Sequence, residues 1–156
     1  MCEYCGCQAV TVIDELTREH ELVVNMIGDV RAAHGNGDID RMAEAARRMA
    51  AVLEPHTAVE EEGLFPVMAQ EFPDQIAALE SEHRGMEAVL AEAAGATPTD
   101  PGWPDRFLLA LEALRGHVLR EQDGVFPAAL STLETEEWRA AEAVRARVGG
   151  MLSAAE

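Results

Sequence analysis

An eleven-residue motif occurs twice in this chain and limits the folds that the chain can adopt. The first copy, residues 56–66, reads HTAVEEEGLFP, and the second, residues 117–127, reads HVLREQDGVFP, so matched positions are 61 residues apart (117 − 56 = 61). This agreement indicates an internal duplication. Residues i and i+4 share one face of a helix, so the His and Glu of each copy can bind one metal ion together. The candidate ligands are His56, Glu60, His117 and Glu121.

Composition and charge favour a helical protein and exclude two classes of partner. The 156 residues suffice for one domain with a core, and an aromatic content of only 4% favours helices. The net charge is −17, and all 12 basic residues are arginine. The chain therefore lacks the positive charge that binds nucleic acid or an anionic membrane, and we expect neither partner.

The chain carries no recognisable export signal. No apolar run approaches the roughly 20 residues of a membrane span, and the first residues, MCEY, are neither basic nor apolar. All three cysteines, Cys2, Cys5 and Cys7, lie at the start of the chain, unlike a disulfide framework. These features predict a cytoplasmic protein.

The sequence predicts an all-α fold, an up-down-up-down four-helix bundle with a short fifth C-terminal helix. Apolar residues recur at alternating steps of three and four, as in a bundle core. Helices are expected at about residues 10–31, 38–63, 73–94 and 135–148, and a further helix, which carries Phe107, Ala110, Leu114, His117 and Glu121, follows a linker at 95–104. Asp38 and Thr135 should be N-caps, Pro55 should kink the second helix, and Gly63 should end it. The predicted organisation is a tail at 1–9, the bundle at 10–133 and the C-terminal helix at 134–156.

Ionisable residues occupy core positions on all four bundle helices. They are His20, His56, Glu60, His83, His117 and Glu121. A single histidine at such a position is usually a hydrogen-bonded core residue, but six ionisable groups in one core are costly to desolvate unless they pair or bind metal. One zinc ion takes four ligands, so this set suits two ions.

Bridging by both glutamates would divide the histidines evenly between the two ions. One ion would take His20 and His56 and the other His83 and His117, so that each has four protein donors. One or two positions would remain for an oxo or hydroxo bridge and a small molecule. Histidine–carboxylate sites with open positions favour iron, so we predict two iron ions.

The pattern of these residues resembles hemerythrin-like (HHE cation-binding) di-iron proteins of the bacterial type. The resemblance covers about Val10 to Leu130 and rests on the order of the residues. A single His is followed by His-x-x-x-Glu with the sequence GLFP after it, and then by a second single His and a second His-x-x-x-Glu. It implies a non-haem di-iron centre with the six ligands above. Two positions depart from the oxygen carriers, which have a histidine where this chain has Glu87 and a carboxylate where it has Gln122. Both departures argue against reversible oxygen carriage.

The roles of several other polar residues are less constrained. Glu87 follows His83 by four residues, so it is either a ligand or near-ligand group, or a solvated glutamate. Five further acids are expected to be solvated: Glu19, Glu61, Glu62, Glu82 and Asp123. His34 should be a helix C-terminal histidine. The N-terminal tail carries Cys2, Cys5 and Cys7. Their thiols either reduce or protect the metal core or bind metal themselves, or these cysteines have no specific role.

Three functions are compatible with a di-iron site. The first is a module that binds O₂ or NO in an apolar pocket formed by Ile27, Leu53, Met86, Leu90 and Leu114. The second is an enzyme with catalase-like or NO-handling activity, for scavenging or defence against oxidative or nitrosative stress. The third is iron sensing or donation without catalysis. The expected partner is thus a small diatomic or peroxide ligand, and the oligomeric state is left open.

Overall fold

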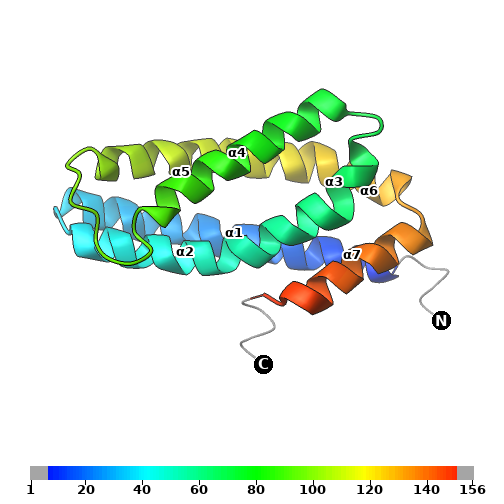
Figure 1. The fold of residues 1–156 in the computed structure, drawn as a ribbon, viewed down its shortest axis with the longest axis horizontal. Helices are drawn as coiled ribbons and strands as arrows, with labels where there is room; N and C mark the ends of the chain where they lie inside the picture. The colour runs from blue at the N-terminus through cyan, green and yellow to red at the C-terminus, as the bar shows by residue number, and fades with distance from the viewer. Residues whose placement is uncertain (1–6, 151–156) are drawn as a thin grey trace.

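The structure is a computed structural model that describes residues 7–150. Four long helices run side by side in alternating directions, as Figure 1 shows. They are α1 (Cys7–Gly35), α2 (Ile39–Val59), α4 (Pro73–Ala91) and α5 (Trp103–Arg120). All regular structure in the described residues is helical, so the predicted all-α bundle is confirmed. None of these described helices is long and apolar enough to cross a membrane.

Helix boundaries follow local chemistry, with two differences from the prediction. The Asp38 side chain accepts a hydrogen bond from the N–H of Arg41, so it caps α2 as expected. α5 begins at Trp103, inside the segment expected as a linker (95–104), because Pro104 fits the first helical turn, where no N–H is needed. The helix α7 (Thr135–Val148) is capped by Glu134 rather than Thr135, since Glu134 forms a capping box with Glu137.

Both copies of the motif change from α-helix to π-helix at the motif glutamate, Glu60 or Glu121. The π-helical turns η2 (Glu60–Leu64) and η3 (Glu121–Val125) follow α2 and α5 directly, and they lead into α3 (Phe65–Met68) and α6 (Phe126–Thr132). The prediction that Gly63 ends the second helix was wrong, because the chain stays helical through it. π-helical turns of this length are uncommon and occur often at functional sites.

The apolar core consists of two clusters with the ionisable residues between them. One cluster fills the end of the bundle near the α1–α2 and α4–α5 connections and includes Val30, Met42 and Trp103. The other fills the opposite end and includes Leu16, Phe65 and Trp138. The apolar residues that recur at steps of three and four along the four helices are buried in the core, apart from Ile13, Leu53 and Ala110, which are partly exposed.

α7 packs against α1, α2 and η2, and a glycine permits this contact. A Cβ at Gly63 would lie 3.0 Å from both Cα and Cβ of Ala141 on α7. Gly124 is the matching residue of the second copy, and a Cβ there would have no neighbour within 4 Å. The first copy therefore needs glycine for packing, while the second does not.

We predict that Gly63→Ala lowers the melting temperature, whereas Gly124→Ala raises it or leaves it unchanged. The methyl group at 63 meets the α7 backbone, and overpacking of this kind costs about 1–3 kcal/mol. At 124 the alanine stabilises the helix by roughly 0.5–1 kcal/mol relative to glycine. Thermal unfolding followed by circular dichroism measures both changes. Equal shifts in the two variants would show that α7 does not pack closely on η2.

Candidate metal centre

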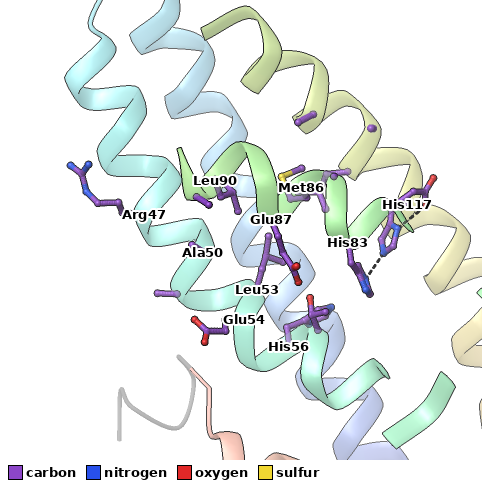
Figure 2. A pocket seen from close by; sticks show the side chains of 18 of the residues that line it. Arg47, Ala50, Leu53, Glu54, His56, His83, Met86, Glu87, Leu90 and His117 are labelled. Carbon is purple, nitrogen blue, oxygen red and sulfur yellow. Dashed lines mark hydrogen bonds and ion pairs between the residues drawn. The ribbon is translucent and has the colours of Figure 1, made fainter. Parts of the chain in front are cut away.

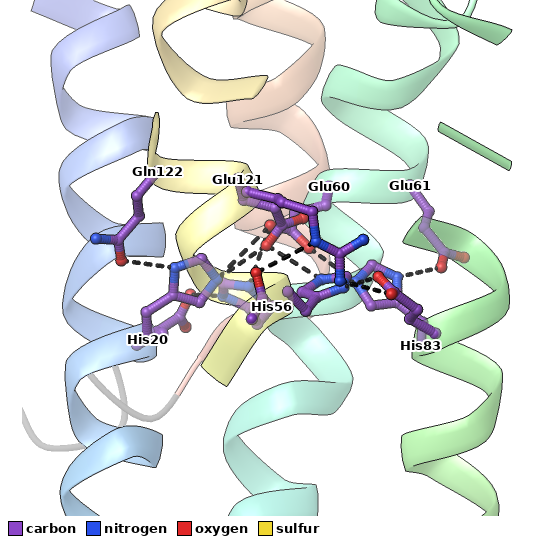
Figure 3. A network of polar contacts seen from close by, with 12 residues as sticks. His20, His56, Glu60, Glu61, His83, Glu121 and Gln122 are labelled. Atoms are coloured by element: carbon purple, nitrogen blue, oxygen red, sulfur yellow. Dashed lines mark hydrogen bonds and ion pairs between the residues drawn. The ribbon is translucent and has the colours of Figure 1, made fainter. Parts of the chain in front are cut away.

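The six predicted ligands converge in one buried layer across the bundle. The four histidines come from different helices: His20 from α1, His56 from α2, His83 from α4 and His117 from α5. Glu60 and Glu121 begin the two π-helical turns. None of the six residues is more than 7% exposed. Figure 3 shows the glutamates lying between the histidines.

Their donor atoms form two overlapping groups, each of a size that could hold one metal ion. One group contains His20, His56, Glu60 and Glu121, and the other contains Glu60, His83, His117 and Glu121. Within each group, the donor atoms lie within 4.8 Å of one another. Both groups share the two glutamates and divide the histidines into the predicted pairs.

The imidazole nitrogens that face the glutamates are the Nε2 atoms. Nε2 of His20 lies 3.1 Å from Glu121 Oε1, and Nε2 of His83 lies 3.1 Å from Glu60 Oε1. Nε2 of His56 is 3.3 Å from Glu60 Oε2. The Nε2 atoms of His83 and His117 are only 3.1 Å apart. Such close nitrogens need a shared proton or a shared metal ion between them.

The carboxylates of this layer fit a metal pair because no other group satisfies them. Both oxygens of Glu60 and of Glu121 are buried and have no hydrogen-bond partner among the described residues. The same is true of His20 Nε2. A buried polar atom without a partner is costly, and a charged one more so. Four carboxylate oxygens facing imidazole nitrogens form a donor set that divalent first-row metals bind.

Each histidine also contacts a polar residue through Nδ1, the nitrogen that points away from the glutamates. The partners are Gln122 for His20 (3.0 Å), Glu19 for His56 (3.1 Å), Glu61 for His83 (2.6 Å) and Glu82 for His117 (2.9 Å). With an oxygen acceptor at this distance, Nδ1 carries the proton and donates it, which leaves Nε2 free to bind a metal. We call these four partners the outer shell.

The outer shell corrects three predictions. Glu19, Glu61 and Glu82 were expected to be solvated, but Glu19 is 1% exposed and the other two are partly buried. Glu19 and Glu82 do point away from the histidine that follows them, yet this direction takes them to the histidine of the next helix. The dipeptide Glu-His, present on both α1 and α4, was the sequence signal for this arrangement.

An arginine also donates to each carboxylate of the outer shell. Arg145 of α7 donates to both oxygens of Glu19, from Nη2 to Oε1 at 2.7 Å and from Nη1 to Oε2 at 2.9 Å. Arg84 donates to Glu61 and Arg120 donates to Glu82, each at 2.6 Å. The sequence analysis predicts no role for Arg84, Arg120 or Arg145.

The buried charges shift the pKa values of the layer in opposite directions. Burial alone lowers the pKa of His56, but the charge of Glu60 and the close contacts of the ring with Glu19 and Glu60 outweigh it and raise the pKa to about 10. The same balance raises the pKa of His83 to about 9. Burial raises the pKa of Glu60, but the neighbouring imidazoles dominate and hold it well below its ordinary value.

The remaining candidates lie outside this layer. Glu87 is 51% exposed and pairs with Arg84 at 3.1 Å, and it belongs to neither donor group. Glu62 and Asp123 are exposed, as expected. His34 lies in the last turn of α1, also as expected, and contacts Asp105. Cys2, Cys5 and the side chain of Cys7 lie outside the described residues.

A mostly apolar cavity of about 930 Å³ reaches the buried layer of histidines and glutamates from the side of α2, α4 and α5. It contacts all four histidines at one end, and Figure 2 shows it extending along α2 to Arg47. Of the five residues expected to form a pocket, four line this cavity: Leu53, Met86, Leu90 and Leu114. Ile27 does not line it but is buried in the adjoining cluster.

We predict that the metal-free protein becomes less stable as pH rises from about 6.5 to 10. The raised pKa values of His56 and His83 stabilise the fold fully below the ordinary histidine pKa of 6.5, and this stability is lost toward pH 9–10. No lysine is present to titrate in this range. Thermal melts in chelator at pH 6.5 and 9.5 measure the loss. A melting temperature that is flat or rises over this range would contradict it.

Comparison with known proteins agrees with this geometry. No curated protein and no solved structure shows significant similarity to the chain. The family model described as the hemerythrin HHE cation-binding domain matches residues 11–129. This range covers most of the chain and includes all six residues of the buried layer. The chain therefore belongs to the hemerythrin family of HHE cation-binding domains.

Proposed function

We propose that this protein holds two iron ions and uses them to react with O₂, H₂O₂ or NO, in scavenging or in defence against oxidative or nitrosative stress. The observation that carries the proposal is the pair of buried glutamates whose four oxygens have no hydrogen-bond partner in the described residues. Family membership implies cation binding, and this is the one buried place where several donors converge in the described chain.

The ligand roles follow from the two donor groups. Glu60 and Glu121 each belong to both groups, so these two residues would serve both ions. His20 and His56 complete one position, and His83 and His117 complete the other. Four donors per ion leave coordination positions open, and iron in such a site supplies redox chemistry toward small molecules.

The surrounding side chains select for a small neutral reactant. Leu53, Met86 and Leu114 line the cavity that leads to the histidines, and its surface is mostly apolar. Glu54, Glu82 and Glu87 also line it, so an anion would be repelled. O₂, NO and H₂O₂ are uncharged and fit easily into the available volume. The apolar wall also limits water beside the open positions.

A second candidate function is reversible binding or sensing of O₂ without catalysis. One observation favours it: Glu87 turns its carboxylate to Arg84 and is half exposed. In this arrangement Glu87 does not occupy the coordination position that an incoming ligand needs. Oxidation of the iron is then governed by the six ligands alone.

We predict two iron ions per chain in the wild type and fewer in His56→Ala and in His117→Ala. Each change removes one of the four donors of a single position. Anaerobic iron reconstitution with metal analysis gives the count, and loss of metal should also lower the melting temperature, because binding stabilises only the folded state. His34→Ala is the control, since this histidine lies outside the layer and should leave two ions bound. Retention of two ions in both site variants would refute the ligand assignment.

We also predict that the diferrous protein oxidises in air without a reversible oxygenated form, and that it consumes H₂O₂. Stopped-flow absorbance after mixing with O₂, H₂O₂ and NO in turn measures these reactions. Glu87→Ala should give the same traces, because the Glu87 carboxylate is paired with Arg84 and lies outside both donor groups. A stable, reversible spectrum with O₂ would favour the second candidate.

A further inference from the structure

The outer shell makes the same contacts in both halves of the bundle, the half with α1 and α2 and the half with α4 and α5. The residue before the histidine of the first helix contacts the histidine of the second: Glu19 contacts His56, and Glu82 contacts His117. The residue after each bridging glutamate contacts the first-helix histidine of the other half. Glu61 contacts His83 in this way, and Gln122 contacts His20. The donors and their supports thus have approximate twofold symmetry.

At one position of the outer shell the two halves differ in charge. Three of the four Nδ1 partners are carboxylates, each paired with an arginine. The fourth is the amide oxygen of Gln122, at the motif position that Glu61 fills in the other copy. Figure 3 shows these two residues at opposite ends of the layer. Their contact lengths differ as well, at 3.0 Å for His20 and 2.6 Å for His83.

The neighbouring sequence favours a neutral residue at position 122. Glu61 is held by Arg84, the residue that follows His83. The residue that follows His20 is Glu21. By the approximate symmetry, a carboxylate at 122 would therefore face an acid where Glu61 faces an arginine. At the sequence positions that hold Glu61 and Arg84 in one half, the other half has Gln122 and Glu21, so these matched positions do not carry two like charges.

The acceptor on Nδ1 determines how strongly the imidazole donates through Nε2. A carboxylate that accepts the Nδ1 proton raises the basicity of the ring, and such charge-assisted hydrogen bonds are roughly twice as strong as neutral ones. An amide oxygen polarises the ring less. His20 is therefore a weaker electron donor than His83, although both are buried histidines with a glutamate oxygen 3.1 Å from Nε2.

We propose that Gln122 is a positioning residue that makes the two metal positions electronically unequal. The ion held by His20 and His56 receives less charge and favours the ferrous state, and the ion held by His83 and His117 favours the ferric state. The inequality arises outside the ligand set, which is itself symmetric. This inference rests on the proposed function, because it concerns the same two iron positions.

Exchange of the two residues tests the inference. In Gln122→Glu both first-helix histidines have a carboxylate, and in Glu61→Gln both have an amide, so each single variant should make the two iron positions more alike. The double variant Glu61→Gln/Gln122→Glu inverts the inequality and should restore it. Mössbauer spectra of the ⁵⁷Fe-loaded diferric proteins should show two distinct quadrupole doublets in the wild type, convergence in both single variants and separation again in the double variant.

Redox titration gives a second measurement that does not depend on turnover. The midpoint potential should become more negative in Gln122→Glu and more positive in Glu61→Gln, and it should return close to the wild-type value in the double variant. Asp123→Asn is the control for net charge, because this exposed acid is adjacent to Gln122 in sequence and should change neither the potential nor the spectra. Glu61→Gln keeps the shape of the side chain, so it serves as the test if Gln122→Glu fails to fold.

The outcomes separate this inference from the proposed function. Fewer than two irons in the wild type would refute the proposed function itself. Two bound irons with spectra unchanged in both single variants would overturn the inference and leave the proposed function standing. Quadrupole doublets that stay converged in the double variant would also overturn it, because the exchange of the two residues would then not have restored the inequality.

Discussion

The burial of Glu60 and Glu121 between two apolar clusters is the interaction on which the rest of the structure depends. A carboxylate moved from water into a protein core costs several kcal/mol unless positive charge meets it. The four imidazoles meet these carboxylates through Nε2, and either protons or metal ions can supply the charge. The charge of the two glutamates contributes to the raised pKa values of His56 and His83, together with Glu19 and Glu61 on the other side of the rings. The layer is therefore a site for cations built into a hydrophobic bundle.

Support for this layer extends outward through the outer shell to the surface of the protein. Each histidine is fixed by a hydrogen-bond acceptor, and three of these acceptors are fixed by arginines. Two of the arginines belong to the bundle, but Arg145 belongs to α7. α7 is thus linked to the candidate metal centre through Glu19 and His56, as well as through its contact with Gly63. The C-terminal helix is part of the construction of the site, although it contributes no ligand.

The cavity connects this arrangement to the proposed chemistry. Its mostly apolar wall suits the small neutral molecules of the proposed function. It is lined by all four histidines, so both proposed metal positions would be reached from the same side. A difference in electron donation between the positions would then decide where an incoming molecule reacts, since access alone does not.

The sequence by itself determined the bundle, the six residues of the layer and their division into two groups. These features depend on spacing along single helices, where i and i+4 geometry is local, and on a repeated motif that is visible without coordinates. The role of Glu87 could not be decided from the sequence, because helical periodicity places it close to both His83 and Arg84 on the same helix and does not show which of the two it contacts. Only the tertiary structure decided the outer shell. Glu19, Glu61 and Glu82 looked solvated because periodicity on one helix indicates only which side chains point away from that helix's own histidine. Their true partners, and Arg145, come from other helices, and only the packing of those helices brings them within hydrogen-bond distance.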